Sequence, residues 1–194
     1  MEKGRQGARD AILRSVLTVL GEDGLDKVTH RNAAQKAGVS PGTVSYHFPA
    51  RDDLIQAAFS QYVSDYQETL ATAISETPLR TRDDLVQFLA GTTALSPDHL
   101  TVTAIEYEMA LLAHRTPAIS SEVKAWQRTM EPILSDVLET LGVARPIEAA
   151  RLVLSVCRGT EFEVMARGVT VPREQFAARL NRVLDSLLTP SASM

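Results

Sequence analysis

Cysteine, long apolar runs and processing signals are scarce or missing in this chain, and each shortage excludes a class of protein. The single cysteine, Cys157, cannot build an internal disulfide framework, which suits a reducing cytoplasm. No apolar run approaches the roughly 18 residues of a membrane-spanning helix. The first residues lack the apolar segment and small-residue cleavage site of a signal peptide. We therefore expect a cytoplasmic protein without a membrane segment, and the 44% of hydrophobic residues suffices for a core.

Patterns typical of catalysis are also missing. The sequence contains no HExxH, GxSxG, P-loop or GxGxxG motif, and its histidines are too dispersed for a metal site. Glu106 and Glu108 are two residues apart on an expected helix, so they face different directions and do not form a carboxylate pair. Cys157 lies in the apolar segment LVLSVCRG, which favours a small buried residue over a nucleophile. We expect neither an enzyme nor a metal or organic cofactor.

Strand signals are weak, whereas helical periodicity runs through almost the whole chain. β-Branched residues are scattered, and nowhere does a sustained alternation lie between turn residues. Apolar residues from Ala11 to Leu20 form the stripe of a first helix, and Pro132 should kink or split one of the later helices. Breaks at proline and glycine delimit further helices at about 51–75, 82–94, 98–114, 118–141, 146–167 and 173–188. The sequence predicts an all-α fold of about nine helices.

Charge is unevenly distributed along the chain. Residues 1–51 contain eight Lys/Arg and five Asp/Glu, a formal charge of +3. Because the whole chain carries −4, the remainder carries −7. A basic N-terminal part on an acidic body is typical of a protein that contacts phosphate through one end only.

The segment from Thr29 to Leu54 carries the most specific pattern in the sequence. Thr29 can cap a short helix, and Gly38 supplies the backbone freedom that a sharp exit from it needs. Ser40 and Pro41 then start a second helix at once, with serine as the cap and proline at the first helical position. Two helices joined by such a turn form a helix-turn-helix, whose second helix enters the major groove of DNA.

This segment resembles the tetracycline-repressor (TetR) family of bacterial transcription regulators. The similarity covers about residues 8–60 and rests on VTHRNAAQKAGVSPGTVSYHFPARDDL, with its Ala-Gly-Val-Ser turn and its aromatic cluster ending in Phe48. It implies a DNA-binding domain at 1–48 and a helical regulatory domain for ligand binding and dimerisation at 49–194. Ser45 departs from the family pattern, since many relatives have an aromatic residue there.

The resemblance implies which residues contact double-stranded operator DNA. Arg31 and Arg51 can neutralise phosphates, which positions the protein without reading sequence. Thr43 can offer a hydroxyl or a methyl group to a base, and Gly42 lets the backbone approach closely. The DNA-contacting set is Thr29, His30, Arg31, Ser40, Pro41, Gly42, Thr43, Ser45, Tyr46, His47 and Arg51.

The last two predicted helices have wide apolar faces that exceed what one chain needs to cover them. A four-helix bundle across a two-fold axis would bury the excess, and close approach of a partner helix would compensate the helix-interior Gly159. We therefore predict a homodimer. The expected interface residues are Val153, Val156, Gly159, Leu180, Val183, Leu184 and Leu187.

The resemblance also implies a repressor that is released from DNA by a small molecule bound in a pocket of the larger domain. The mixed residues that could line this pocket lead us to expect a mostly apolar molecule with a polar or ionisable group. Aromatic and apolar residues of the larger domain, with a few polar ones, are the candidates for this site. They are Tyr62, Tyr66, Phe88, Glu106, Tyr107, Met109, Leu111, His114, Trp126, Met130, Arg158 and Phe162. Core packing is the competing role for each. A transcriptional activator, a ligand-free regulator and a helical adaptor that binds protein are the alternative functions.

Overall fold

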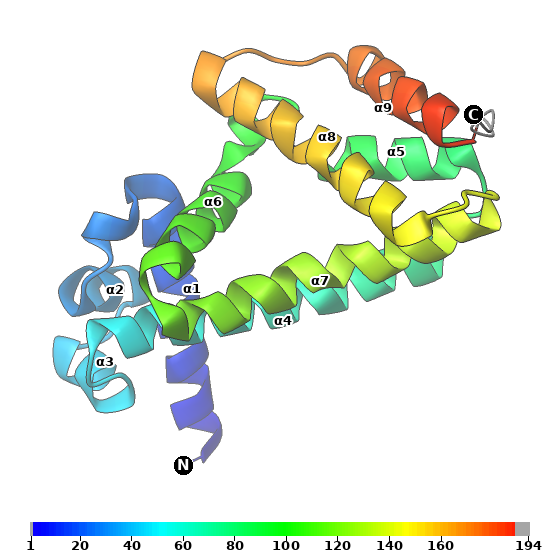
Figure 1. Ribbon diagram of the computed structural model, residues 1–194. Coiled ribbons are helices and arrows are strands. Elements are labelled where there is room, and N and C mark those ends of the chain that lie inside the picture. Colours follow the sequence, from blue (N-terminus) through cyan, green and yellow to red (C-terminus); the bar gives the residue numbers. More distant parts are fainter. Residues whose placement is uncertain (1, 189–194) are drawn as a thin grey trace. The chain divides into compact units, whose positions relative to one another are not determined.

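The structure is a computed structural model that describes the backbone of residues 2–188 and the side chains of residues 7–117 and 119–188 (Figure 1). Over this range the chain is α-helical and contains no β-strand. The elements are α1 (Glu2–Asp23), η1 (Leu25–Lys27), α2 (His30–Ala37), α3 (Pro41–His47), α4 (Arg51–Glu76), α5 (Arg82–Thr92), η2 (Pro97–His99), α6 (Leu100–Arg115), α7 (Pro117–Thr140), α8 (Pro146–Arg167) and α9 (Arg173–Leu188). The predicted all-α class is confirmed.

Most predicted helix limits lie within two or three residues of the observed ones. The helices predicted at 146–167 and 173–188 match α8 and α9. Two details differ. α1 begins well before Ala11, and of the two outcomes predicted at Pro132, a kink or a split, the split does not occur, because α7 runs through Pro132 although proline removes one backbone hydrogen bond there. Among the described helices, none combines the length and the apolar character that crossing a bilayer requires.

The helices pack into two compact units. The first contains the described residues up to Thr69 together with Ala104–Trp126, and the second contains Leu70–Thr103 and the described residues from Gln127 onwards. The first unit thus joins the predicted helix-turn-helix to the first part of α4 and to parts of α6 and α7. This division follows packing, whereas the predicted boundary after residue 48 separates functions and stays a prediction.

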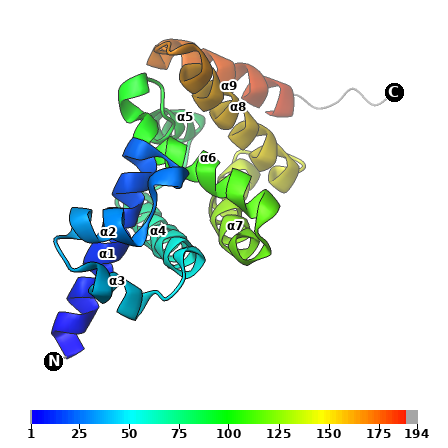
Figure 2. The same ribbon diagram turned by 90° about the vertical axis from the view of Figure 1, so that its left-hand side faces the viewer.

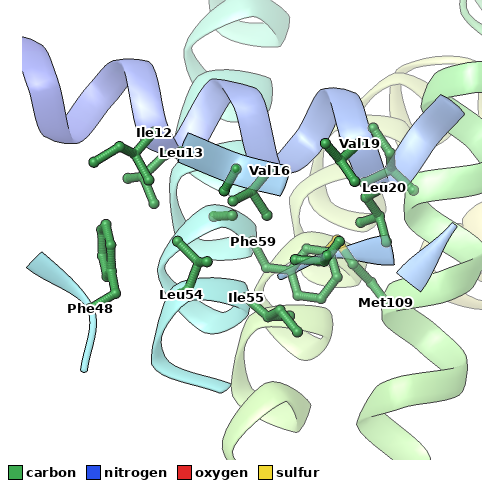
Figure 3. Packing of buried hydrophobic residues seen from close by; sticks show 14 of the residues in the cluster. Ile12, Leu13, Val16, Val19, Leu20, Phe48, Leu54, Ile55, Phe59 and Met109 are labelled. Carbon is green, nitrogen blue, oxygen red and sulfur yellow. The ribbon is translucent and has the colours of Figure 1, made fainter. Parts of the chain in front are cut away.

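One continuous hydrophobic core holds the first unit together (Figure 3). Leu13 and Val16 of α1 lie three residues apart and so share one helix face, which packs towards Leu54 and Phe59 of α4. Met109 of α6 belongs to the same core and is fully buried. The helix-turn-helix therefore shares its core with α4 and α6, so a displacement of α4 would disturb it directly.

In the second unit, α9 packs against both α5 and α8. Thr81 and Asp84 form a capping box that starts α5, since each side chain accepts a hydrogen bond from the other residue's backbone N–H. From the same turn, Arg82 donates to the side chain and the backbone carbonyl of Asn181 and forms an ion pair with Asp185. The start of α5 is thereby fixed to α9.

A buried carboxyl group connects α8 to the end of α5. Glu161 is only 9% exposed, and its Oε1 accepts a hydrogen bond from the backbone N–H of Ala94 at 3.2 Å. Burial raises the pKa of Glu161, and the Ala94 bond and the charge of Arg158 offset part of this effect. Burial also raises the pKa of Cys157 to about 11, so its thiol stays protonated at neutral pH, as expected for a core residue.

Replacing Glu161 by glutamine should stabilise the protein at pH 7. Because the pKa of Glu161 is raised on folding, the native state binds the proton more tightly than the unfolded chain. The wild type therefore loses stability as the pH rises above the ordinary value of 4.5, whereas a glutamine side chain stays neutral and does not. Thermal melting should give Glu161→Gln the higher midpoint at pH 7, with the difference vanishing at pH 4. A lower midpoint at pH 7 would contradict this prediction.

Candidate DNA-binding interface

Local hydrogen bonds define the helix-turn-helix as the sequence predicts. The Thr29 hydroxyl accepts a hydrogen bond from the Asn32 backbone N–H at 3.1 Å and caps α2. Gly38 ends that helix with a φ of 69°, a left-handed conformation that glycine adopts without strain. Ser40 caps α3 by accepting from the Thr43 backbone N–H at 3.1 Å, with Pro41 at the first helical position. The predicted roles of these cap and turn residues are confirmed.

The short α3 presents one face to solvent and is anchored by the other. Val44 is fully buried and Phe48, directly after the helix, is 4% exposed. Tyr46 is 66% exposed, and its ring meets that of His47 edge-on at 5.3 Å. The remaining exposed residues of this face are Pro41, Gly42 and Ser45, whereas Thr43 and His47 are half-buried. The predicted recognition residues therefore share one accessible surface.

Two of the predicted DNA contacts also hold the unit together internally. His30 Nε2 lies 2.6 Å from the carbonyl oxygen of Phe48, which can only accept, so Nε2 carries the proton and donates it. Arg51 donates through Nε to the carbonyl of Val28 and through Nη2 to that of Leu25, both at 2.6 Å. The His30 bond joins the start of α2 to the residue that follows α3, and the Arg51 bonds join the segment before α2 to the start of α4. The sequence pattern gave no sign of these bonds.

Three further basic residues of the first unit differ in whether a described group pairs with them. Lys36 forms an ion pair with Glu22 at 2.6 Å. Arg31 is exposed on the first turn of α2, and no group within the described part of the chain pairs with it. Arg9, which lies outside the predicted DNA-contacting set, places its guanidinium carbon 5.6 Å from the centre of the Phe48 ring. Its helical spacing from Ile12 and Leu13 is the signal that could have revealed this position.

The predicted ligand-site residues fall in both units. In the first unit the Tyr62 hydroxyl donates to Glu106 Oε1 at 2.5 Å, and the Tyr62 and Tyr66 rings stack with centres 6.3 Å apart. Trp126 packs against the core of that unit, Met109 is fully buried, Tyr107 is half-buried, and Leu111 and His114 are exposed. In the second unit Met130 is buried, Phe88 and Arg158 are half-buried, and Phe162 is 59% exposed. Among these candidates, the contacts described above join the Tyr62, Tyr66 and Glu106 side chains.

The predicted dimer residues are likewise of two kinds. Val153, Leu180 and Leu184 are completely buried inside the second unit, where they pack α8 and α9 together. Val156, Gly159, Val183 and Leu187 are at least partly accessible. A Cβ atom added at Gly159 would meet no atom within 4 Å. Only these four of the predicted dimer residues therefore have surface that a partner protomer could contact.

Comparison with known proteins identifies the family. A family model described as "Tetracyclin repressor-like, C-terminal domain" matches residues 80–186, more than half of the chain, and one described as "Bacterial regulatory proteins, tetR family" matches residues 12–58. The chain belongs to the tetR family. The family predicted from the helix-turn-helix segment is thereby confirmed, and the match to the C-terminal model extends it beyond the resemblance seen in the sequence.

Individual tetR relatives match parts of the sequence and nearly the whole fold. The transcriptional repressor KstR2 of Mycolicibacterium smegmatis is 28% identical over 109 residues, which cover 54% of this chain and 51% of that protein. The chain spans about half the length, or less, of the curated relatives it matches.

Solved structures extend the similarity. A transcriptional regulator from Rhodococcus sp. Rha1 is 21% identical, covers 93% of this chain and 95% of its own, and has a TM-score of 0.78. The multidrug-binding protein EbrR, crystallised with ethidium, is 25% identical, covers 91% of this chain and 97% of its own, and has a TM-score of 0.70. These similarities confirm the arrangement of an N-terminal helix-turn-helix followed by a larger helical part.

Proposed function

We propose that this tetR-family protein is a homodimeric repressor that binds operator DNA and is released by a small ligand. The observation that carries the proposal is the exposed face of α3, which buried Val44 and Phe48 anchor at the basic end of the chain. A helix anchored in this way can enter the major groove without losing its position. An operator-binding regulator acts where the chromosome lies, in the bacterial cytoplasm.

In this proposal the contacts divide into those that position the protein and those that read bases. Arg31 and Arg51 bind phosphates, Arg51 through the Nη1 group that neither of its internal bonds uses. Thr43, Ser45 and Tyr46 face the groove from α3, and Ser45 offers a hydroxyl where many relatives carry a ring. Thr29, Ser40, Pro41, Gly42 and His47 complete the predicted surface, and His30 supports it through its bond to Phe48.

Substituting Thr43 tests this reading of α3. The Ser40 cap uses the backbone N–H of Thr43, so Thr43→Ala keeps that bond and removes the Thr43 hydroxyl together with its 2.9 Å hydrogen bond to the Ser40 hydroxyl. We expect it to weaken operator binding by about 1–3 kcal/mol and binding to unrelated DNA very little. Fluorescence anisotropy on an operator duplex and on an unrelated duplex measures the ratio of the two affinities. An unchanged operator-to-random ratio would show that α3 does not read bases through Thr43.

The dimer in this proposal forms through an apolar stripe of α8. Leu152, Gly159 and Phe162 lie at helical spacing on one face, and Leu152 and Phe162 are 45% and 59% exposed. Val156 borders this stripe, and the open space around Gly159 lets a partner helix approach closely. A two-fold dimer would also match two operator half-sites about 34–36 Å apart or a multiple of this. Val183 and Leu187 of α9 are secondary contacts.

The effector is proposed to act on the contact between α4 and α6. Glu106 and the stacked rings of Tyr62 and Tyr66 can hold a mostly apolar molecule that carries a polar or charged group. EbrR, whose structure contains ethidium, is a relative for which such a ligand is known. A ligand that displaces Glu106 from Tyr62 would move α4. Arg51 of α4 donates hydrogen bonds to the segment before α2, so the movement would reach the helix-turn-helix. The ligand releases DNA only if it binds the protein with displaced α4 more tightly than it binds the DNA-binding state.

A screen by thermal shift tests the effector, followed by anisotropy on the operator. Compounds that raise the melting temperature should also weaken operator binding. Tyr62→Phe removes the hydroxyl that donates to Glu106, so it should change how strongly a bound compound weakens operator binding. If every stabilising compound left DNA affinity unchanged, release of DNA by a ligand would be excluded, whereas the DNA-binding function would stand.

A protein-binding adaptor is the competing function, and salt dependence separates the two. An operator-binding protein should bind the promoter region beside its own coding sequence with an affinity that falls steeply as salt rises. Transcript levels in a deletion strain then distinguish a repressor, whose target genes rise, from an activator, whose targets fall.

A further inference from the structure

Arg9 of α1 is a basic residue beside the recognition helix that neither the motif nor its turn accounts for. Its guanidinium carbon lies 5.6 Å from the centre of the Phe48 ring, and Phe48 directly follows α3. The ring of His47, the last residue of α3, lies next to that of Phe48 at 6.2 Å. Arg9 therefore stands at the C-terminal end of the helix that faces DNA.

No group that the structure describes engages the N–H donors of Arg9. Within the described residues, no carboxylate pairs with its half-buried side chain and no oxygen accepts a hydrogen bond from it. A contact over an aromatic ring uses the flat face of a guanidinium and leaves the five N–H donors, which lie in its plane, available. Phe48 is held in the core at 4% exposure, so it fixes the position of the charge without neutralising it.

The position of Arg9 on α1 also indicates a side chain that is available to an external partner. Arg9 lies three, four and seven residues before Ile12, Leu13 and Val16, so it continues the buried stripe of α1 beyond the core. Figures 1 and 2 both show the first turns of α1 extending past α3. Arg9 is thus a positive charge at the end of an apolar stripe, and no group in the described part of the chain pairs with it. Such a charge can bind a polyanion that lies alongside the first unit.

We propose that Arg9 binds a phosphate of the DNA backbone beside the bases that α3 faces, with Phe48 as the support that orients it. The contact lies outside the helix-turn-helix and lengthens the DNA footprint on the side of α1. This inference rests on the proposed DNA-binding function. Because phosphates are the same in every sequence, the contact strengthens binding to all DNA and does not change specificity.

The test compares three proteins on two duplexes, one selected by the wild type from a random-sequence library and one of unrelated sequence. Arg9→Met keeps the stem that packs on Phe48 and removes the charge. Arg14→Ala is the matched control, because Arg14 is exposed on the other side of α1 and its replacement removes one charge as well. Dissociation constants are measured by anisotropy from about 50 to 200 mM salt, and thermal melting verifies that the variants are folded.

Arg9→Met should flatten the plot of log Kd against log salt by about 0.9 for each protomer bound, equally on both duplexes, whereas Arg14→Ala should match the wild type. A duplex with single neutral methylphosphonates then locates the contact, since one substitution should weaken the wild type and leave Arg9→Met unaffected. Wild-type slopes in all three proteins would show that Arg9 only packs on Phe48. A wild type that binds neither duplex would overturn the DNA-binding function and this proposal together.

Discussion

Phe162→Glu should convert the proposed dimer into monomers of 21.2 kDa that still fold. Phe162 is 59% exposed in the single chain, so its replacement removes little from the core of the second unit. In a two-fold dimer through α8, two glutamates would instead face each other in an apolar interface, where an unpaired charge is strongly unfavourable. Each protomer would then bind its half-site alone, and operator affinity should fall by about 10²–10⁴-fold.

Sedimentation equilibrium and anisotropy measure the two effects. Leu111→Glu is the matched control, because it adds the same charge at a residue of α6 that is 63% exposed, and it should leave the mass unchanged. Leu184 is a poor choice for this test: it is completely buried within its own unit, so a charge there would unfold the unit. A Phe162→Glu protein that sediments as a dimer and binds the operator normally would exclude the α8 interface.

Arg51→Ala should destabilise the first unit and weaken DNA binding at the same time. The substitution removes two hydrogen bonds, to the carbonyls of Leu25 and Val28, and bonds to a charged group contribute about 1.5–3 kcal/mol each. Without them only core packing connects the segment before α2 to α4. We expect a lower melting temperature, together with a salt slope flatter by about 0.9 from the lost phosphate contact.

Two variants separate these roles of Arg51. Arg51→Lys keeps the charge, but a single ammonium group lacks the two separated donors with which the guanidinium reaches both carbonyls. This variant should therefore be less stable than the wild type and retain its salt slope. Arg31→Ala removes an exposed charge with no described partner, so it should flatten the slope and leave melting unchanged. An Arg51→Ala protein that melts like the wild type would show that the two carbonyl bonds contribute nothing to stability.

The N-terminal motif could be predicted from sequence because its determinants are local. Thr29, Gly38 and Ser40 act on backbone groups within five residues of themselves, so their side chains and spacing define where α2 ends and α3 begins. Helical periodicity located α8 and α9 for the same reason. Such features need no knowledge of distant contacts.

The exposed and buried sides of each helix were harder to assign. Val153 and Phe162 of α8 are both apolar, and their sequence context predicts a dimer contact for Val153 and a ligand contact for Phe162. In the structure Val153 is completely buried and Phe162 is largely exposed. A wide apolar face does not reveal which part of it α9 covers within the same chain and which part stays open. That choice depends on how neighbouring helices pack.

The sequence by itself determined the helices, the helix-turn-helix and the family, since these depend on periodicity, caps and a short motif. Only the tertiary structure decided that Arg51 and His30 bind carbonyls of the first unit and that Arg9 lies over Phe48. These pairs are 18 to 39 positions apart in sequence. Contacts over such separations leave no periodic pattern, because they arise only when the helices pack around a shared core.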